Sequence, residues 1–173
     1  MQHHYLFISS WTIGAPRAQL WDMANEIECI DCWNNVVFDK VAHGDGPDGI
    51  GDVFQCTFQT KMLFRLSIRL KVVDRRKPNQ FTLEVEGPLA GIGTCYMEET
   101  EDGQSTLLRC EWKVRLDHGG LRAFNPVLRP VYIWSHDRVM DEGVQGVAAS
   151  LGATVSDRHH ETKVYRANSR QTS

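Results

Sequence analysis

His136 is the ionisable residue whose place in the sequence best suits chemistry on a bound molecule. It lies in the middle of a predicted amphipathic helix, and an imidazole can accept or donate a proton near neutral pH. Arg129 and Tyr132 fall on the same helical face and could assist proton transfer at a carbonyl group. The alternative is that His136 is a structural histidine with hydrogen-bond partners in the core, and that Arg129 is a surface residue.

Asp137 follows His136 directly, but helical periodicity places the two side chains on different faces. The sequence therefore does not predict a His–Asp dyad, and we expect Asp137 to form an ion pair with a surface arginine. Asp31 is expected to be a solvated carboxylate in a turn.

The five cysteines are the other residues with reactive chemistry. Cys29 and Cys32 form a CxxC motif, which occurs in redox centres and in zinc sites. No second pair and no histidine cluster follows at zinc-ligand spacing, so we expect no metal. Cys56, Cys95 and Cys110 fall inside strand patterns, which favours buried free thiols and a cytoplasmic protein.

Composition excludes several classes of partner. The chain carries 19 Lys and Arg against 22 Asp and Glu, a formal charge of -3, with no block of like charge. This balance gives no electrostatic case for nucleic acid or an anionic membrane. No apolar stretch approaches ~18 residues, so no membrane span is expected. No glycine-rich loop leads into Lys-Ser or Lys-Thr, so we predict neither a phosphate site nor a cofactor.

The middle of the chain alternates apolar and polar residues between Asp52 and Leu116, which is typical of antiparallel strands with one buried face. That face is almost wholly apolar and predicts a cavity wall suited to an apolar molecule. Its predicted members are Phe54, Cys56, Phe58, Phe64, Leu66, Ile68, Leu70, Phe81, Leu83, Val85, Leu108, Cys110, Trp112, Val114 and Leu116.

The N-terminal part predicts a strand, two short helices and another strand. His4 to Ile13 is rich in β-branched and aromatic residues, and Arg17 to Asn25 follows as an amphipathic helix. Residues 26–35 are expected to form the second short helix or a turn, before strand character resumes at Val36 to Val41. The glycines of His43 to Gly51 predict a loop at the mouth of the cavity. About seven strands result.

A long helix from about Arg129 to Leu151 closes the predicted fold, with Pro130 in its first turn. Its inner face is predicted to present Tyr132, His136, Val139, Met140, Gly143, Val147 and Leu151. Residues 154–173 lack apolar periodicity and are expected to be a disordered tail. The sequence thus predicts a single domain over residues 1–153.

Several motifs in this order resemble the START and pollen-allergen superfamily, and within it the polyketide cyclase/dehydrase-like branch. They are Ile13-Gly14-Ala15-Pro16, Leu20-Trp21, Trp33-Asn34, Gly49-Ile50-Gly51, Val85-Glu86-Gly87-Pro88-Leu89 and Trp134-Ser135-His136-Asp137-Arg138-Val139-Met140. The resemblance covers roughly residues 4–152. It implies an α+β helix-grip fold, in which a curved antiparallel sheet wraps around the C-terminal helix.

The resemblance implies a cavity for a lipid, a polyketide or an aromatic metabolite. We expect a monomer or homodimer. The alternatives are a cyclase or dehydratase that uses His136 as general acid or base, and a protein with a collapsed cavity that only modulates a partner. The predicted ligand-binding residues are Trp33, Phe58, Phe64, Leu83, Tyr96, Cys110, Trp112, Arg129, Tyr132, His136 and Met140.

Overall fold

The computed structural model describes residues 3–25, 33, 36–58, 66–116 and 125–166. The second short helix predicted over residues 26–35 lies outside the described residues, except for Trp33. The strands are β1 (His3–Ile13), β2 (Val36–Ala42), β3 (Val53–Phe58), β4 (Leu66–Arg76), β5 (Gln80–Glu86), β6 (Leu89–Glu99), β7 (Thr106–Leu116) and β8 (Val155–Arg166). The helices are α1 (Arg17–Asn25), the short 3₁₀ turn η2 (Pro47–Gly49) and α3 (Asn125–Ser150).

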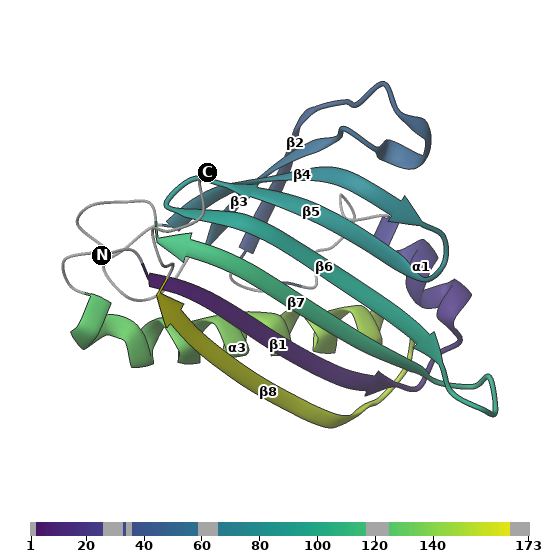
Figure 1. The fold of residues 1–173 in the computed structure, drawn as a ribbon. Coiled ribbons are helices and arrows are strands. Elements are labelled where there is room, and N and C mark those ends of the chain that lie inside the picture. Colours follow the sequence, from purple (N-terminus) through teal and green to yellow (C-terminus); the bar gives the residue numbers. More distant parts are fainter. Residues whose placement is uncertain (1–2, 26–32, 34–35, 59–65, 117–124, 167–173) are drawn as a thin grey trace, which may run out of the picture.

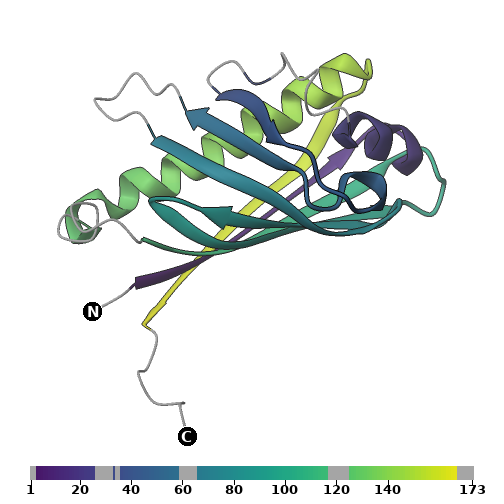
Figure 2. The same ribbon diagram turned by 90° about the horizontal axis from the view of Figure 1, so that it is seen from above.

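The strands form one antiparallel sheet in the order β2-β3-β4-β5-β6-β7-β1-β8. The sheet curves, and α3 lies lengthwise along its inner face with α1 at one end (Figures 1 and 2). The alternation read from the sequence explains the two faces. Phe54, Cys56 and Leu70 are buried, while the intervening Arg69 and Lys71 are exposed.

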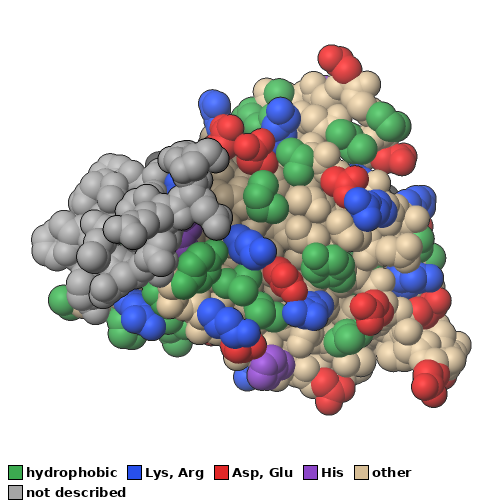
Figure 3. All heavy atoms as spheres, viewed as in Figure 1, with side chains coloured by type: hydrophobic (Ala, Val, Ile, Leu, Met, Phe, Trp, Pro, Cys, Tyr) green, Lys and Arg blue, Asp and Glu red, His purple; other side chains and the backbone are tan. Residues whose placement is uncertain are grey.

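Charged side chains of both signs are mixed over the face of the molecule seen in Figure 3. Exposed large apolar residues are present, among them Ile92 on β6 and Trp134 on α3. Arg138 lies 5.4 Å from the Trp134 ring. The intermixed charge on this face gives little support to the hypothesis of a partner-binding apolar surface there.

The core lies in three clusters that α1 and α3 help to close. Trp11, Leu20 and Trp21 pack with Val144 and Ala148, where α1, β1 and the end of α3 meet. A second cluster joins the inner faces of β2 to β5, and a third joins β1 and β7 below the start of α3. None of the helices described here is long and apolar enough to cross a membrane.

The predicted disordered tail is wrong for residues 155–166, and the folded domain therefore extends past residue 153. These residues form β8, which pairs antiparallel with β1 from Ile13 opposite Val155 to His3 opposite Arg166. The register shifts between Ser10 and Thr12. Most β8 side chains are polar and exposed, so the strand forms through backbone pairing to β1 rather than through an apolar pattern.

Asp141 joins α3 to β1 and β8. One carboxylate oxygen accepts bonds from Trp11 Nε1 at 2.8 Å and His160 Nε2 at 3.0 Å. The other accepts from Arg158 at 2.9 Å. His160 Nδ1 in turn lies 2.9 Å from the hydroxyl of the buried Ser9. Because these partners come from two neighbouring strands, β1 and β8, the carboxylate fixes how α3 sits on the sheet.

The prediction of three buried free thiols is correct only for Cys56. Cys95 and Cys110 face each other directly across β6 and β7 and form a disulfide. Both side chains point inward from adjacent strands, which places their sulfur atoms within bonding reach. Cys95 and Cys110 therefore no longer support the prediction of a cytoplasmic protein, which was based on free thiols. Cys29 and Cys32 lie outside the described residues.

A chain shortened after Ala153 should be less stable than the full chain by about 2 kcal/mol or more, since Asp141 loses two partners and β1 loses a neighbour. Urea denaturation measures this difference. The matched control ends after Arg166 and should unfold like the full chain. Equal stability of all three chains would show that β8 contributes nothing to folding.

Candidate functional site

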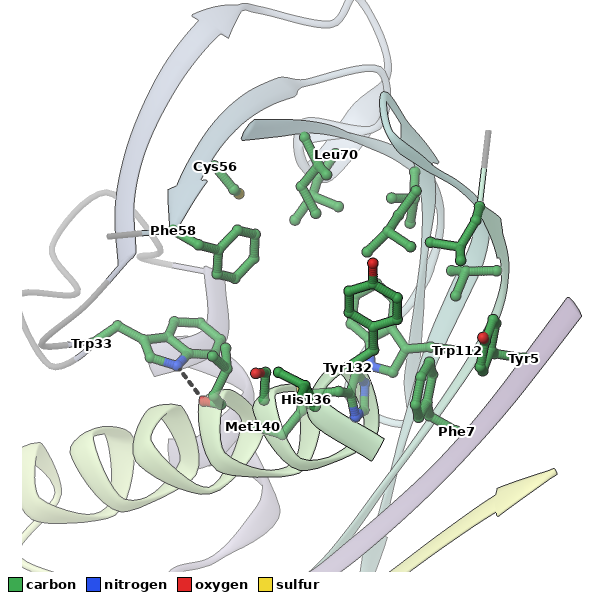
Figure 4. Close-up of a pocket in the computed structure, with 18 of the residues that line it drawn as sticks. Tyr5, Phe7, Trp33, Cys56, Phe58, Leu70, Trp112, Tyr132, His136 and Met140 are labelled. Atoms are coloured by element: carbon green, nitrogen blue, oxygen red, sulfur yellow. Dashed lines mark hydrogen bonds between the residues drawn. The ribbon is translucent and has the colours of Figure 1, made fainter. Parts of the chain in front are cut away.

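A cavity of about 260 Å³ lies between α3 and the concave face of the sheet (Figure 4). Its wall is mostly aliphatic and aromatic. The lining residues are Tyr5, Phe7, Trp33, Phe38, Cys56, Phe58, Ile68, Leu70, Val85, Leu89, Trp112, Val114, Leu116, Val131, Tyr132, Ser135, His136, Val139 and Met140.

The helical repeat of α3 brings its cavity residues onto one stripe. Tyr132, His136 and Met140 follow one another at intervals of four residues, and Val139 lies beside them. Strands supply the opposite wall, because alternate residues of each strand face inward. Residues spaced four apart along α3 and residues spaced two apart along the strands therefore line the same cavity.

Trp33 closes one side of the cavity by packing against the backbone of α3. Its indole N–H donates to the Val139 carbonyl at 2.6 Å, the bond drawn in Figure 4. One turn further on, Gly143 makes this approach possible, because a Cβ at that position would overlap the Trp33 ring. Phe38 of β2 stands beside the indole, with ring centroids 5.1 Å apart.

Six of the predicted ligand-binding residues line the cavity: Trp33, Phe58, Trp112, Tyr132, His136 and Met140. Phe64 lies outside the described residues.

The other four predicted residues do not line the cavity. Leu83 and Cys110 do face inward, but they are buried in the packed core clusters. Tyr96 faces the other side of the sheet, since its neighbours Cys95 and Met97 take the inward positions of β6. Arg129 is exposed to solvent near the start of α3.

Sequence reasoning missed the contribution of β1. Tyr5 and Phe7 line the cavity, although the predicted wall began only at Phe54. The signal was present, because Tyr5, Phe7, Ser9 and Trp11 alternate with exposed or half-buried residues and all four are buried. The strand prediction for His4 to Ile13 assigns no inward face.

His136 is held between a ring and a carboxylate. Its imidazole stacks on Phe7 with centroids 3.9 Å apart and an interplanar angle of 14°. Its Nδ1 lies 3.3 Å from Asp137 Oδ1, so the expectation that Asp137 turns away from the imidazole is wrong. The same oxygen lies 3.7 Å from His160 Nδ1 on β8. Asp137 points toward β8 rather than solvent, and that strand was not predicted.

Burial lowers the pKa of His136 from its ordinary value of 6.5, and nearby His160 acts in the same direction. The hydrogen bond and charge of Asp137 oppose this effect without overcoming it. The imidazole is therefore neutral near pH 7. A neutral imidazole carries one donor and one acceptor nitrogen, as a general base requires.

Three buried polar atoms on the cavity residues have no hydrogen-bond partner within the described protein: Trp112 Nε1, Tyr132 OH and His136 Nε2. Leaving a buried polar group unsatisfied costs about 1–3 kcal/mol. Burial, reinforced by nearby Tyr5, raises the pKa of Tyr132, so its phenol retains its proton. Together with the hydroxyls of Tyr5 and Ser135, these atoms are the polar minority of a mostly apolar lining.

Cys56 is the described cysteine on the cavity wall. Burial, with a smaller effect of Asp39, raises the pKa of its thiol to about 12. The described residues contain no group of three or more His, Cys, Asp or Glu arranged to hold a metal ion.

Comparison with known proteins rests on structure, since no family model matches the sequence and no curated protein matches it. A START superfamily protein from Mycobacterium smegmatis has a TM-score of 0.64 at 12% identity, covering 85% of this chain and 99% of its own. Norcoclaurine synthase from Thalictrum flavum, crystallised with a transition-state analogue, has a TM-score of 0.59 at 10% identity, covering 88% and 98%. The chain has the helix-grip fold.

The di-domain ARO/CYC protein StfQ of the steffimycin biosynthetic pathway is also similar to this helix-grip chain. Its TM-score is 0.58 at 17% identity, and the match covers 83% of this chain and 43% of StfQ. The predicted START-like fold, with its curved antiparallel sheet and long C-terminal helix, is thus confirmed. At these identities the likeness establishes the fold and leaves the function to the residues of the cavity.

Gly143→Ala should displace Trp33 from α3, because the added Cβ overlaps the indole. A glycine-to-alanine change inside a helix ordinarily raises stability by about 1 kcal/mol. Here we expect a loss of about 1–3 kcal/mol, measured by urea denaturation, with a change in tryptophan fluorescence. Gln145→Ala, at an exposed position of the same helix, is the control and should not destabilise the protein. A stabilised Gly143→Ala protein would contradict the packing described for Trp33.

Proposed function

We propose that this protein binds an apolar small molecule, such as a lipid, a polyketide or an aromatic metabolite, in the cavity between the sheet and α3. The observation that carries the proposal is the cavity of about 260 Å³ with its mostly apolar lining. Ligand pockets typically have volumes of about 300–1,000 Å³ and few polar groups, so this one suits a compact guest.

Aromatic side chains on the lining favour a guest with a flat ring system over a long flexible chain. Trp33, Phe58 and Trp112 come from separate parts of the sequence and meet at the cavity. Ring faces and edges contact planar molecules through offset or edge-to-face packing. The StfQ and norcoclaurine synthase similarities support the proposal, because StfQ belongs to the steffimycin biosynthetic pathway and the norcoclaurine synthase structure contains a transition-state analogue.

The neutral fluorescent dye N-phenyl-1-naphthylamine should bind the protein and brighten, since the cavity removes it from water. Leu70→Trp places a larger ring in the cavity and should weaken dye binding by about tenfold or more. Lys71→Trp is the matched control, because the adjacent residue is exposed on the other face of β4. Fluorescence titration measures both, with thermal unfolding to confirm that each variant folds. Dye binding unchanged by Leu70→Trp would place the dye elsewhere.

A second candidate function is proton transfer at a carbonyl group, as in a cyclase or dehydratase. The specific observation in its favour is His136, whose Nε2 has no hydrogen-bond partner among the described residues while Asp137 approaches its Nδ1. This arrangement orients an imidazole toward a bound molecule as a base. Trp112 and Tyr132 could then donate to the carbonyl oxygen as negative charge develops on it.

The second candidate predicts that the protein accelerates exchange of the α-hydrogens of 2-tetralone, a compact bicyclic ketone, in deuterium oxide. His136 would remove the α-proton, the resulting imidazolium would exchange that proton with deuterium oxide, and the ring would return a deuteron to the enolate. His136→Gln should lower the exchange rate about 10²-fold while dye binding persists. Proton NMR follows the exchange, with Ser150→Ala on the exposed end of α3 as control. Equal exchange with and without protein would refute the enzymatic role for this ketone and leave the binding role standing.

A further inference from the structure

Three residues on the cavity wall carry buried polar atoms that have no hydrogen-bond partner within the described part of the protein. Tyr132 and His136 lie one turn apart on α3, and Trp112 faces the same space from β7. Figure 4 shows these three side chains on one side of the cavity, across from Cys56 and Leu70. A purely hydrocarbon guest would leave Trp112 Nε1, Tyr132 OH and His136 Nε2 buried with no partner in the part of the chain that the structure describes.

Asp137 determines which nitrogen of His136 carries the proton. A carboxylate only accepts hydrogen bonds, so the bond at 3.3 Å requires a proton on His136 Nδ1. In the neutral imidazole Nε2 is then an acceptor. Burial lowers the pKa of His136, which keeps the ring in this neutral form near pH 7.

The other two atoms have different capacities. Trp112 Nε1 can only donate a hydrogen bond, whereas the Tyr132 hydroxyl can donate or accept. The wall therefore offers an acceptor at His136, a donor at Trp112 and a group of either kind at Tyr132. A hydroxyl is the smallest ligand group that both donates and accepts, and so it matches this combination.

We infer that the guest of this cavity carries a hydroxyl group, which donates to His136 Nε2 and accepts from Trp112 or Tyr132. The inference rests on the proposed binding function and narrows it to phenols and apolar alcohols. The apolar remainder of the guest occupies the space toward β3, β4 and β5, where Phe58, Leu70 and Val85 line the wall.

The test compares three compounds with the same ring system: naphthalene, 2-methoxynaphthalene and 2-naphthol. Each competes with N-phenyl-1-naphthylamine for the full-length protein, and displacement is followed by fluorescence. We expect 2-naphthol to bind about tenfold more tightly than naphthalene. We expect 2-methoxynaphthalene to fall short of 2-naphthol, because its oxygen accepts but cannot donate.

Variants identify the protein atoms responsible. His136→Phe keeps a ring against Phe7 but removes the acceptor, and Tyr132→Phe removes the hydroxyl. Each should reduce the preference for 2-naphthol over naphthalene several-fold. Gln145→Ala, at an exposed position of α3 outside the cavity, is the control, and the preference should persist. Two separate variants guard against one that fails to fold.

The outcomes distinguish the hydroxyl inference from the binding proposal. A preference for 2-naphthol that shrinks in both variants and persists in Gln145→Ala supports the inference. Equal affinities for the three compounds in the unmodified protein overturn it while leaving apolar binding intact. A preference that survives both variants also overturns it, since other groups would then recognise the hydroxyl. Failure of the protein to bind the dye and all three compounds would refute the binding proposal itself.

Discussion

The carboxylate of Asp141 is the contact on which the geometry of the site depends. It accepts bonds from Trp11 on β1 and from Arg158 and His160 on β8, and so it ties α3 to two neighbouring strands. Apolar packing alone would leave a helix some freedom to rotate or slide along a curved sheet. Directional bonds to a charged group restrict that freedom. The direction in which Tyr132 and His136 face follows from this attachment.

The two flanks of α3 have complementary roles. Toward β1 and β8, Asp137 and Asp141 meet polar partners, while the next faces of the helix turn aromatic and aliphatic side chains to the cavity. Trp33 covers another part of the helix because Gly143 leaves room for its ring. The helix can therefore line a largely apolar cavity while the carboxylates of Asp137 and Asp141 keep polar partners.

The helix-grip fold could be predicted because its inner strands and its helix carry strong apolar periods. Strand β8 could not, since residues such as His160 and Thr162 are held by backbone pairing and polar contacts that no hydrophobic pattern records. Because β8 is not predicted from the sequence, Asp137 is predicted to face solvent instead of that strand. The alternation of β5 predicts that Leu83 points inward. It does not predict that Leu83 lies in the packed core and does not line the cavity. Tyr96 faces outward because the phase of β6 follows Cys95 and Met97.

The thiol of Cys56 determines whether an electrophilic guest would react with the cavity wall at this position. A cysteine attacks electrophiles as its thiolate, and a pKa of about 12 leaves almost none of that form at neutral pH. Quinones and unsaturated ketones, which are common among oxidised aromatic compounds, would meet sulfur here as a small apolar surface. An electrophilic guest bound in the way proposed above would therefore form no covalent adduct at this residue.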